Sequence, residues 1–110
     1  YKTAYNAAKH GIAGLTKTVA LEVAEDGITC NAVSPGAVMT PLVRKQIPDL
    51  ARTAGISEDE ALSKVLLARQ PNKRAVEASE IGALVAFLAS DAAASITGAN
   101  IPVDGGWTAQ

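Results

Sequence analysis

The sequence has 110 residues, which is enough for at most one domain. Hydrophobic residues make up 48% and charged residues 19%, with a formal net charge of −1, and this balance is typical of a globular chain. It supplies no basic surface for nucleic acid, and no apolar run approaches the roughly 20 residues of a membrane span. The single cysteine, Cys30, excludes an intrachain disulfide and a Cys-based metal site.

The first segment predicts a helix from about Thr3 to Glu25. Alanines make its other faces small and apolar, so it is expected to be buried on more than one side. Gly27 is the expected left-handed cap. The apolar stripe of this helix consists of Ala8, Ile12, Leu15, Val19 and Val23.

Tyr5 and Lys9 stand four residues apart in this helix and therefore project from one face. A phenol is a poor base at neutral pH, but an ammonium about 4 Å away stabilises the phenolate form. The pair is thus able to form a tyrosinate base, although such spacing also occurs in solvated aromatic–cation pairs. Tyr1 has no lysine four residues on and is expected to make a surface or lid contact. His10 lies about 100° around the helix from Lys9, which favours a structural or surface role.

A short buried parallel strand is expected from Ile28 to Val33, with Cys30 as a buried, inert thiol. Ser34-Pro35-Gly36 is expected to stop it. Ligands of open α/β sheets bind beyond the carboxyl ends of strands, so residues 35–40 are expected to lie beside a cofactor. A plain turn at Pro35-Gly36 is the alternative.

Two short helices are expected next, from Pro41 to Ala54 and from Ser57 to Arg69, with a break near Gly55. Ser57 followed by Glu60 three residues later is a capping-box signature. Leu62, Val65 and Leu66 would form the apolar face of the second helix.

The last part of the chain predicts a helix from Ala78 to about Ser90, a loop over 91–97 and a strand from Ala99 to Val103. The residues of the helix that are expected to point inward are Ile81, Leu84, Val85 and Leu88.

Taken in order, these motifs resemble the C-terminal part of the short-chain dehydrogenase/reductase family. The resemblance implies an α/β fold, a doubly wound parallel sheet (Rossmann) with a helical substrate lid over about residues 41–70. Residues 1–110 are expected to be the C-terminal part of a single dinucleotide-binding domain, because no Gly-rich phosphate loop or upstream βαβ unit is present. The segments that carry the resemblance are Tyr5-Asn6-Ala7-Ala8-Lys9, Asn31-Ala32-Val33-Ser34-Pro35-Gly36, Thr40-Pro41 and the closing Thr97 to Trp107.

The resemblance gives the tyrosine–lysine pair its roles. Tyr5 would take the proton of the substrate hydroxyl while a hydride leaves for the nicotinamide. Lys9 would stabilise the tyrosinate and bind the nicotinamide ribose, so both residues would also contact the cofactor. The family's catalytic serine and asparagine precede the tyrosine and are not in this chain, and Ser34 does not replace that serine.

The remaining cofactor contacts are implied for the segment after the first strand. Pro35 and Gly36 would lie under the nicotinamide ring. The backbone of Val38 would contact the carboxamide, and the hydroxyl of Thr40 would reach the carboxamide or the pyrophosphate.

Several segments look more specifically like the bacterial members of the family that act on D-3-hydroxybutyrate, above all Lys45-Gln46-Ile47-Pro48-Asp49. By that resemblance Lys2 and Gln46 would bind the substrate carboxylate, and Trp107 would help to close the pocket. The alternatives are a solvated lysine, a polar lid residue and a tryptophan packed at a subunit contact. Ala37 replaces an aromatic residue of some of these enzymes, which leaves room for a slightly longer 3-hydroxy acid.

The resulting expectation is a cytoplasmic, homotetrameric, NAD-dependent oxidoreductase that interconverts (R)-3-hydroxybutyrate and acetoacetate in the full-length protein. No metal, nucleic acid or membrane is expected as a partner. NADP stays open, because the residues that select the cofactor are not in this chain. Two alternatives remain. One is a 3-oxoacyl thioester reductase or another short-chain dehydrogenase that uses NADP. The other is a catalytically inert, oligomerising fragment, and residues 1–110 alone are expected to be inactive.

Overall fold

The computed structural model describes residues 2–110, so Tyr1 and its expected contact lie outside it. The chain divides into two compact units. The first unit extends to Ser34 and includes Ala83–Ile101, and the second unit comprises Pro35–Gly82 and Pro102–Gln110.

The first helix, α1, spans Thr3–Glu22 and is followed by a 3-10 turn, η1, at Ala24–Asp26. The predicted end at Glu25 is therefore three residues too late as an α-helix. The last turn tightens instead, as helix ends often do to satisfy their free carbonyls. Gly27 has φ 70° and caps the turn in the left-handed region, as predicted.

The expected burial of α1 on more than one side is wrong within this chain. Thr16 and Ala20 are the buried residues of the helix, whereas Leu15 is 60% and Leu21 is 81% exposed. Ala20 is buried where the loop before the last strand approaches the helix. A Cβ at Gly98 would lie 3.5 Å from that of Ala20.

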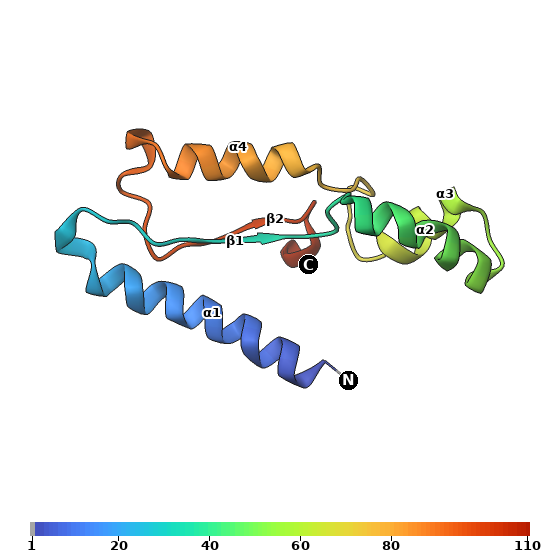
Figure 1. Ribbon diagram of the computed structural model, residues 1–110, viewed down its shortest axis with the longest axis horizontal. Helices are drawn as coiled ribbons and strands as arrows, with labels where there is room; N and C mark the ends of the chain where they lie inside the picture. The colour runs from blue at the N-terminus through green and yellow to red at the C-terminus, as the bar shows by residue number, and fades with distance from the viewer. Residues whose placement is uncertain (1) are drawn as a thin grey trace. The chain divides into compact units, whose positions relative to one another are not determined.

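The two strands, β1 (Ala32–Pro35) and β2 (Asn100–Val103), form a two-stranded parallel sheet, as predicted. In the first unit the strands run between α1 and the C-terminal half of α4, which spans Ala78–Leu88 (Figure 1). The second strand lies within one residue of its expected bounds.

The bounds expected for β1 were wrong at both ends, because the strand starts four residues after Ile28 and includes Ser34 and Pro35. Before the strand, the Asn31 amide donates to the Ile96 carbonyl at 2.7 Å and accepts the Ala99 N–H at 3.0 Å. The Ile96 carbonyl and the Ala99 N–H are thus bonded to a side chain and are not used in a strand ladder. Pro35 cannot donate to the strand ladder, and proline is therefore confined to places such as the edge of a sheet, where that N–H is not needed.

Cys30 also departs from expectation, since it precedes the strand and is only half-buried.

Helix α4 begins at Ala78 as predicted and ends at Leu88, two residues early. Ser90 ends it, because both its N–H (3.0 Å) and its hydroxyl (2.6 Å) donate to the Phe87 carbonyl. Within the expected loop, Asp91–Ala93 forms a 3-10 turn, η3. Ile81, Leu84 and Leu88 are half-buried. Val85 is 50% exposed, contrary to expectation, because it borders an open pocket of about 280 Å³.

The second unit contains the predicted lid helices. Helix α2 spans Pro41–Ala54 as expected, and Gly55 ends it with φ 67°. Helix α3 (Glu58–Glu60) continues as the π-helical turn η2 (Ala61–Leu66). The second helix therefore ends three residues before Arg69. The Lys73 ammonium fixes that end by donating to the carbonyls of Leu67 (3.1 Å) and Ala68 (2.7 Å).

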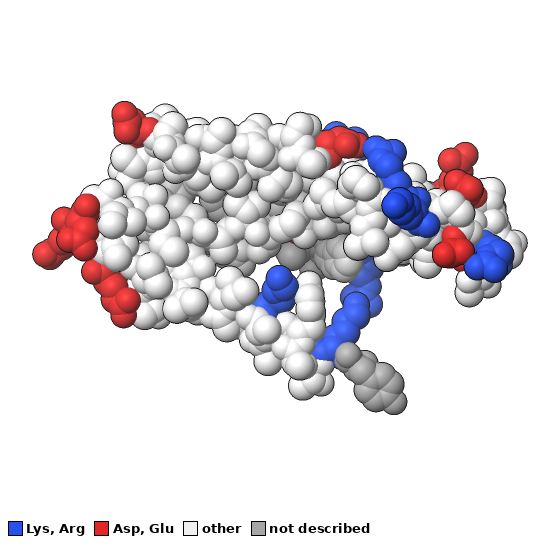
Figure 2. Space-filling model, in the orientation of Figure 1, with Lys and Arg blue, Asp and Glu red and all other residues white. Residues whose placement is uncertain are grey.

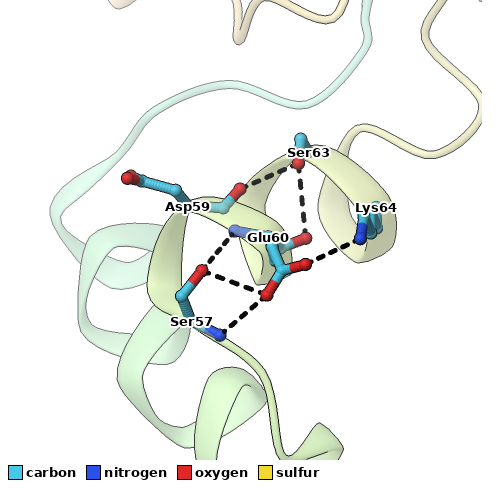
Figure 3. A network of polar contacts seen from close by, with 5 residues as sticks. All are labelled: Ser57, Asp59, Glu60, Ser63 and Lys64. Carbon is cyan, nitrogen blue, oxygen red and sulfur yellow. Dashed lines mark hydrogen bonds and ion pairs between the residues drawn. The ribbon is translucent and has the colours of Figure 1, made fainter.

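The capping box is present at the start of α3 (Figure 3). The Ser57 hydroxyl accepts the Glu60 N–H at 3.2 Å, and the Glu60 carboxylate accepts the Ser57 N–H at 3.3 Å. The Lys64 ammonium also donates to that carboxylate at 2.7 Å. This hydrogen bond, foremost among the contacts of the carboxyl, lowers the pKa of Glu60.

We expect Ser57→Ala to destabilise the lid by about 1 kcal/mol, because the Glu60 N–H loses its capping acceptor. Hydrogen exchange of the lid amides measures the effect. Ser63→Ala is the matched control, since that hydroxyl donates mainly to the Asp59 carbonyl of its own helix, at 2.8 Å. Equal exchange in the two variants would show that the capping box contributes nothing.

Candidate active site

The tyrosine–lysine pair lies on one face of the first turns of α1. The Lys9 ammonium nitrogen is 5.5 Å from the centre of the Tyr5 ring, and the Tyr5 side chain is 61% exposed. A cation over a ring face is attracted by the ring quadrupole, which holds the two groups together. The arrangement leaves the phenol accessible to a substrate.

Lys2 and His10 lie close to this pair in the sequence, and both bond to Asn6. Lys2 precedes the helix and is exposed, and its carbonyl accepts the Asn6 N–H at 2.8 Å. The His10 ring Nδ1 donates to the Asn6 carbonyl at 2.8 Å. His10 is thus bonded to its own helix, which agrees with the structural or surface role expected for it.

The segment after β1 passes close to the C-terminal segment in the second unit. A Cβ at Gly36 would lie 2.7 Å from Gln70 Oε1 and 2.9 Å from Asp104 Cα, so only glycine fits there. The Gly36 N–H donates to the Val103 carbonyl at 3.0 Å. Close packing thus fixes the backbone directly beyond Pro35.

Val38 and Thr40 follow on the same segment. Val38 forms a parallel bridge with Val76, and its carbonyl accepts the Thr40 N–H at 2.8 Å. The Thr40 hydroxyl caps α2 by accepting the Val43 N–H at 3.2 Å. That hydroxyl still has its hydrogen to donate. Thr40 therefore starts the lid helix and can also bind a ligand.

Gln46 and Trp107 also belong to the second unit. Gln46 is exposed on α2. Trp107 begins the 3-10 turn η4 (Trp107–Ala109) and is 37% exposed. The candidates thus divide between the units, with Lys2, Tyr5 and Lys9 in the first and the others in the second.

Three residues shape the second unit and were not predicted as site residues, namely Gln70, Asn72 and Asp104. The Asp104 carboxylate accepts the N–H of Gly106 (3.0 Å) and both the N–H (2.9 Å) and the hydroxyl (2.7 Å) of Thr108. An aspartate before two glycines is a turn signal that could have revealed this bonding. Gln70 gave no comparable signal, because glutamine is mostly exposed in proteins.

The Asp104 bonds make stability depend on pH. The Thr108 hydroxyl, foremost among its donors, lowers the pKa of Asp104 below its ordinary value of 3.8. A lowered carboxyl pKa stabilises the fold above the unfolded-state pKa, and this contribution is lost as pH falls through the folded-state pKa. We expect Asp104→Asn to be less stable than the wild type at neutral pH, with a gap that closes below pH 3.8. Urea melts at several pH values measure the gap, and one that stays constant would contradict the role of the charge.

The distribution of charged side chains and the character of the helices bear on possible partners. Figure 2 shows acidic and basic side chains together on the lid, whereas α4 is largely uncharged. Within residues 2–110, no helix has the length and apolar character to cross a membrane. In the same described range, His, Cys, Asp and Glu side chains form no group of three that could hold a metal ion.

Comparison with known proteins shows which family and which solved structures the chain resembles. The family described as enoyl-(acyl carrier protein) reductase matches residues 1–108. The D-beta-hydroxybutyrate dehydrogenase of Rhizobium meliloti is 57% identical over the whole chain, which spans 43% of that relative's length. The protein of the same name from Cupriavidus necator is 50% identical over 99% of the chain and 42% of its own length. The structure of L-sorbose reductase from Gluconobacter frateurii, complexed with NADPH and L-sorbose, is 31% identical over 100% of this chain and 42% of its own, with a TM-score of 0.88.

These findings identify an α/β fold of the Rossmann type, as predicted. The chain belongs to the short-chain dehydrogenase/reductase family. It spans about two fifths of the length of the relatives that it matches.

Proposed function

We propose that this chain is the C-terminal part of a dehydrogenase domain that interconverts (R)-3-hydroxybutyrate and acetoacetate with NAD. The observation that carries the proposal is the 57% identity to a D-beta-hydroxybutyrate dehydrogenase over all 110 residues. The placement of Tyr5 and Lys9 on one helical face supplies the matching chemistry.

In the proposed reaction the Tyr5 phenolate accepts the proton of the substrate hydroxyl. The Lys9 ammonium stabilises the phenolate and donates to the ribose. A bound nicotinamide would supply the hydride acceptor for the carbon that bears this hydroxyl, so the alcohol would become a ketone and one coenzyme would be reduced. The backbone of Val38 and the Thr40 hydroxyl, which keeps its hydrogen to donate, would contact the carboxamide, and Pro35 and Gly36 would lie under the nicotinamide ring. The upstream serine and asparagine of the family would complete the site.

The substrate contacts proposed are Lys2, Gln46 and Trp107. A short 3-hydroxy acid carries one negative charge, which an ammonium and an amide N–H can bind. Lys2 and Gln46 are both exposed and thus accessible to it. Trp107 offers a partly exposed apolar ring that can cover the aliphatic end of the acid.

A second candidate function is reduction of a 3-oxoacyl thioester with NADPH. The family description names an enoyl-(acyl carrier protein) reductase, and the matching sorbose reductase structure contains NADPH. Parallel assays of the full-length protein with both coenzymes and both substrate types distinguish the two functions. A preference for the free acid with NAD supports the dehydrogenase.

The apolar residues exposed on α1 and α4 favour burial against further protein. We propose that the full-length protein is a cytoplasmic homotetramer, in which other parts of the domain and its copies cover Leu15, Leu21, Val85 and Phe87. Light scattering during size-exclusion chromatography measures the assembly, and a stable monomer would contradict it.

We expect Gln46→Ala to raise the KM for 3-hydroxybutyrate about 10- to 150-fold, because one hydrogen bond to a charged group is lost. The KM for NAD should change far less. Steady-state kinetics with both substrates varied measures the two constants.

The matched control is Arg52→Ala on the same helix, where the guanidinium only pairs with Asp49 at 2.8 Å on the surface. Equal increases in both KM values after Gln46→Ala would point to a general lid defect and contradict the carboxylate contact.

A further inference from the structure

Gln70 is a fully buried polar side chain of the second unit, with 0% of its surface exposed. Its Oε1 accepts the N–H of Ala37 at 3.2 Å. Its Nε2 donates to Asn72 Oδ1 at 3.3 Å and to the carbonyl of Arg74. One amide therefore links residues 35–40 to the loop that follows the lid.

The Gln70 side chain also packs against the backbone of Gly36, the residue before Ala37. Gly36 approaches Gln70 Oε1 so closely that an added Cβ would lie 2.7 Å from it. The Ala37 carbonyl accepts the Val76 N–H at 2.8 Å. Both backbone polar groups of Ala37 are thus held, one of them by the Gln70 amide.

An amide is suited to this place because it accepts at one end and donates at the other. An apolar side chain of similar length would leave the Ala37 N–H and the Arg74 carbonyl without this partner. Unpaired buried polar groups are costly, so the segment would move toward other partners. Any such movement would displace Val38 and Thr40.

We propose that Gln70 is a positioning residue, which holds residues 35–40 in the conformation that receives the nicotinamide. The inference rests on the part of the proposed function that places the coenzyme at residues 35–40. It is independent of which hydroxy acid or thioester is the substrate. The amide acts through the backbone of Ala37 and does not touch the coenzyme.

The test uses the full-length protein that contains this chain, with Gln70→Met and Gln70→Glu. Met keeps the length and removes the hydrogen bonds, whereas Glu keeps the shape and, as a carboxylate, loses the donors. Lys73→Met is the matched control. It breaks contacts to the Leu67 and Ala68 carbonyls at the end of the lid helix and leaves Ala37 bonded.

Fluorescence titration with NADH, and with NADPH in parallel, gives the dissociation constants. We expect Gln70→Met to weaken coenzyme binding about tenfold or more, because the apparent constant rises as the competent fraction of the loop falls. The KM for the second substrate at saturating coenzyme should stay close to the wild-type value. Melting curves of each variant check that it is folded at the temperature of the titration, since Gln70→Met also removes buried hydrogen bonds. Gln70→Glu should weaken binding as well.

An unchanged dissociation constant in Gln70→Met would overturn the proposal. So would equal losses in the Lys73→Met control, or equal changes in coenzyme affinity and in the KM of the second substrate. Failure of both Gln70 variants to fold would also overturn it, since Gln70 would then be a folding requirement. If the wild type binds coenzyme but does not turn over 3-hydroxybutyrate, the substrate assignment fails. The dissociation constants of the Gln70 variants still test the role of Gln70 in that case. If it binds neither coenzyme, both proposals fail.

Discussion

Replacement of Tyr5 by phenylalanine is expected to lower kcat by roughly 10²- to 10⁴-fold, the usual contribution of a general base. The phenyl ring keeps the shape of the side chain and its contact with the Lys9 ammonium, which lies 5.5 Å from the ring centre. Only the ionisable hydroxyl is lost. Nucleotide binding should therefore remain largely intact.

Steady-state rates and a fluorescence titration with reduced coenzyme, both on the full-length protein, test this expectation together. The titration serves as the control for folding and for the coenzyme site. A Tyr5→Phe variant that retains more than about a tenth of the wild-type kcat would remove the assignment of Tyr5 as the base, since a tenfold loss corresponds to only about 1.4 kcal/mol.

Replacement of Lys9 by alanine is expected to impair both turnover and coenzyme binding. The ammonium is proposed to stabilise the phenolate and also to donate to the ribose. Loss of a hydrogen bond from a charged group weakens binding by about 10- to 150-fold. Turnover should fall further, because the phenolate loses its cation.

Lys17→Ala is the matched control, since Lys17 is an exposed lysine farther along α1. It should leave both quantities near the wild-type values. An unchanged coenzyme affinity in Lys9→Ala would contradict the dual role, even if turnover were lost.

Local signals made α2 and the start of α3 predictable from sequence. Proline at the first helical position, glycine after the last turn and a serine–glutamate capping box act on the backbone within a few residues of their own positions. The bounds of α2, the break at Gly55 and the Ser57 cap accordingly agree with expectation.

The errors arose where distant segments decide the structure. The start of β1 depends on the Asn31 amide, whose partners Ile96 and Ala99 lie near the other strand. The exposure of Val85 depends on an open pocket beside β1 that the periodicity of α4 does not reveal. Hydrophobic patterns describe which face of an element is apolar, and they do not say which neighbour covers it.

In the candidate site, too, the local features were predictable and the contacts between distant segments were not. The spacing of Tyr5 and Lys9 is local, and the helix places them as the sequence indicated. The fit of Gly36 against Gln70 and Asp104 joins three separate parts of the chain and was not predictable. The three site residues of the first unit and the six of the second are therefore predictions that kinetics and coenzyme titration test.

The most direct test of the central claim is the rate at which the full-length protein reduces NAD with each enantiomer of 3-hydroxybutyrate. Ultraviolet absorbance of the reduced nicotinamide follows the reaction, and a separate assay quantifies acetoacetate. The account predicts turnover of the (R) enantiomer, with one acetoacetate formed for each NAD reduced, and far slower turnover of the (S) enantiomer. Absence of coenzyme reduction with (R)-3-hydroxybutyrate, in a preparation that binds NADH, would contradict it.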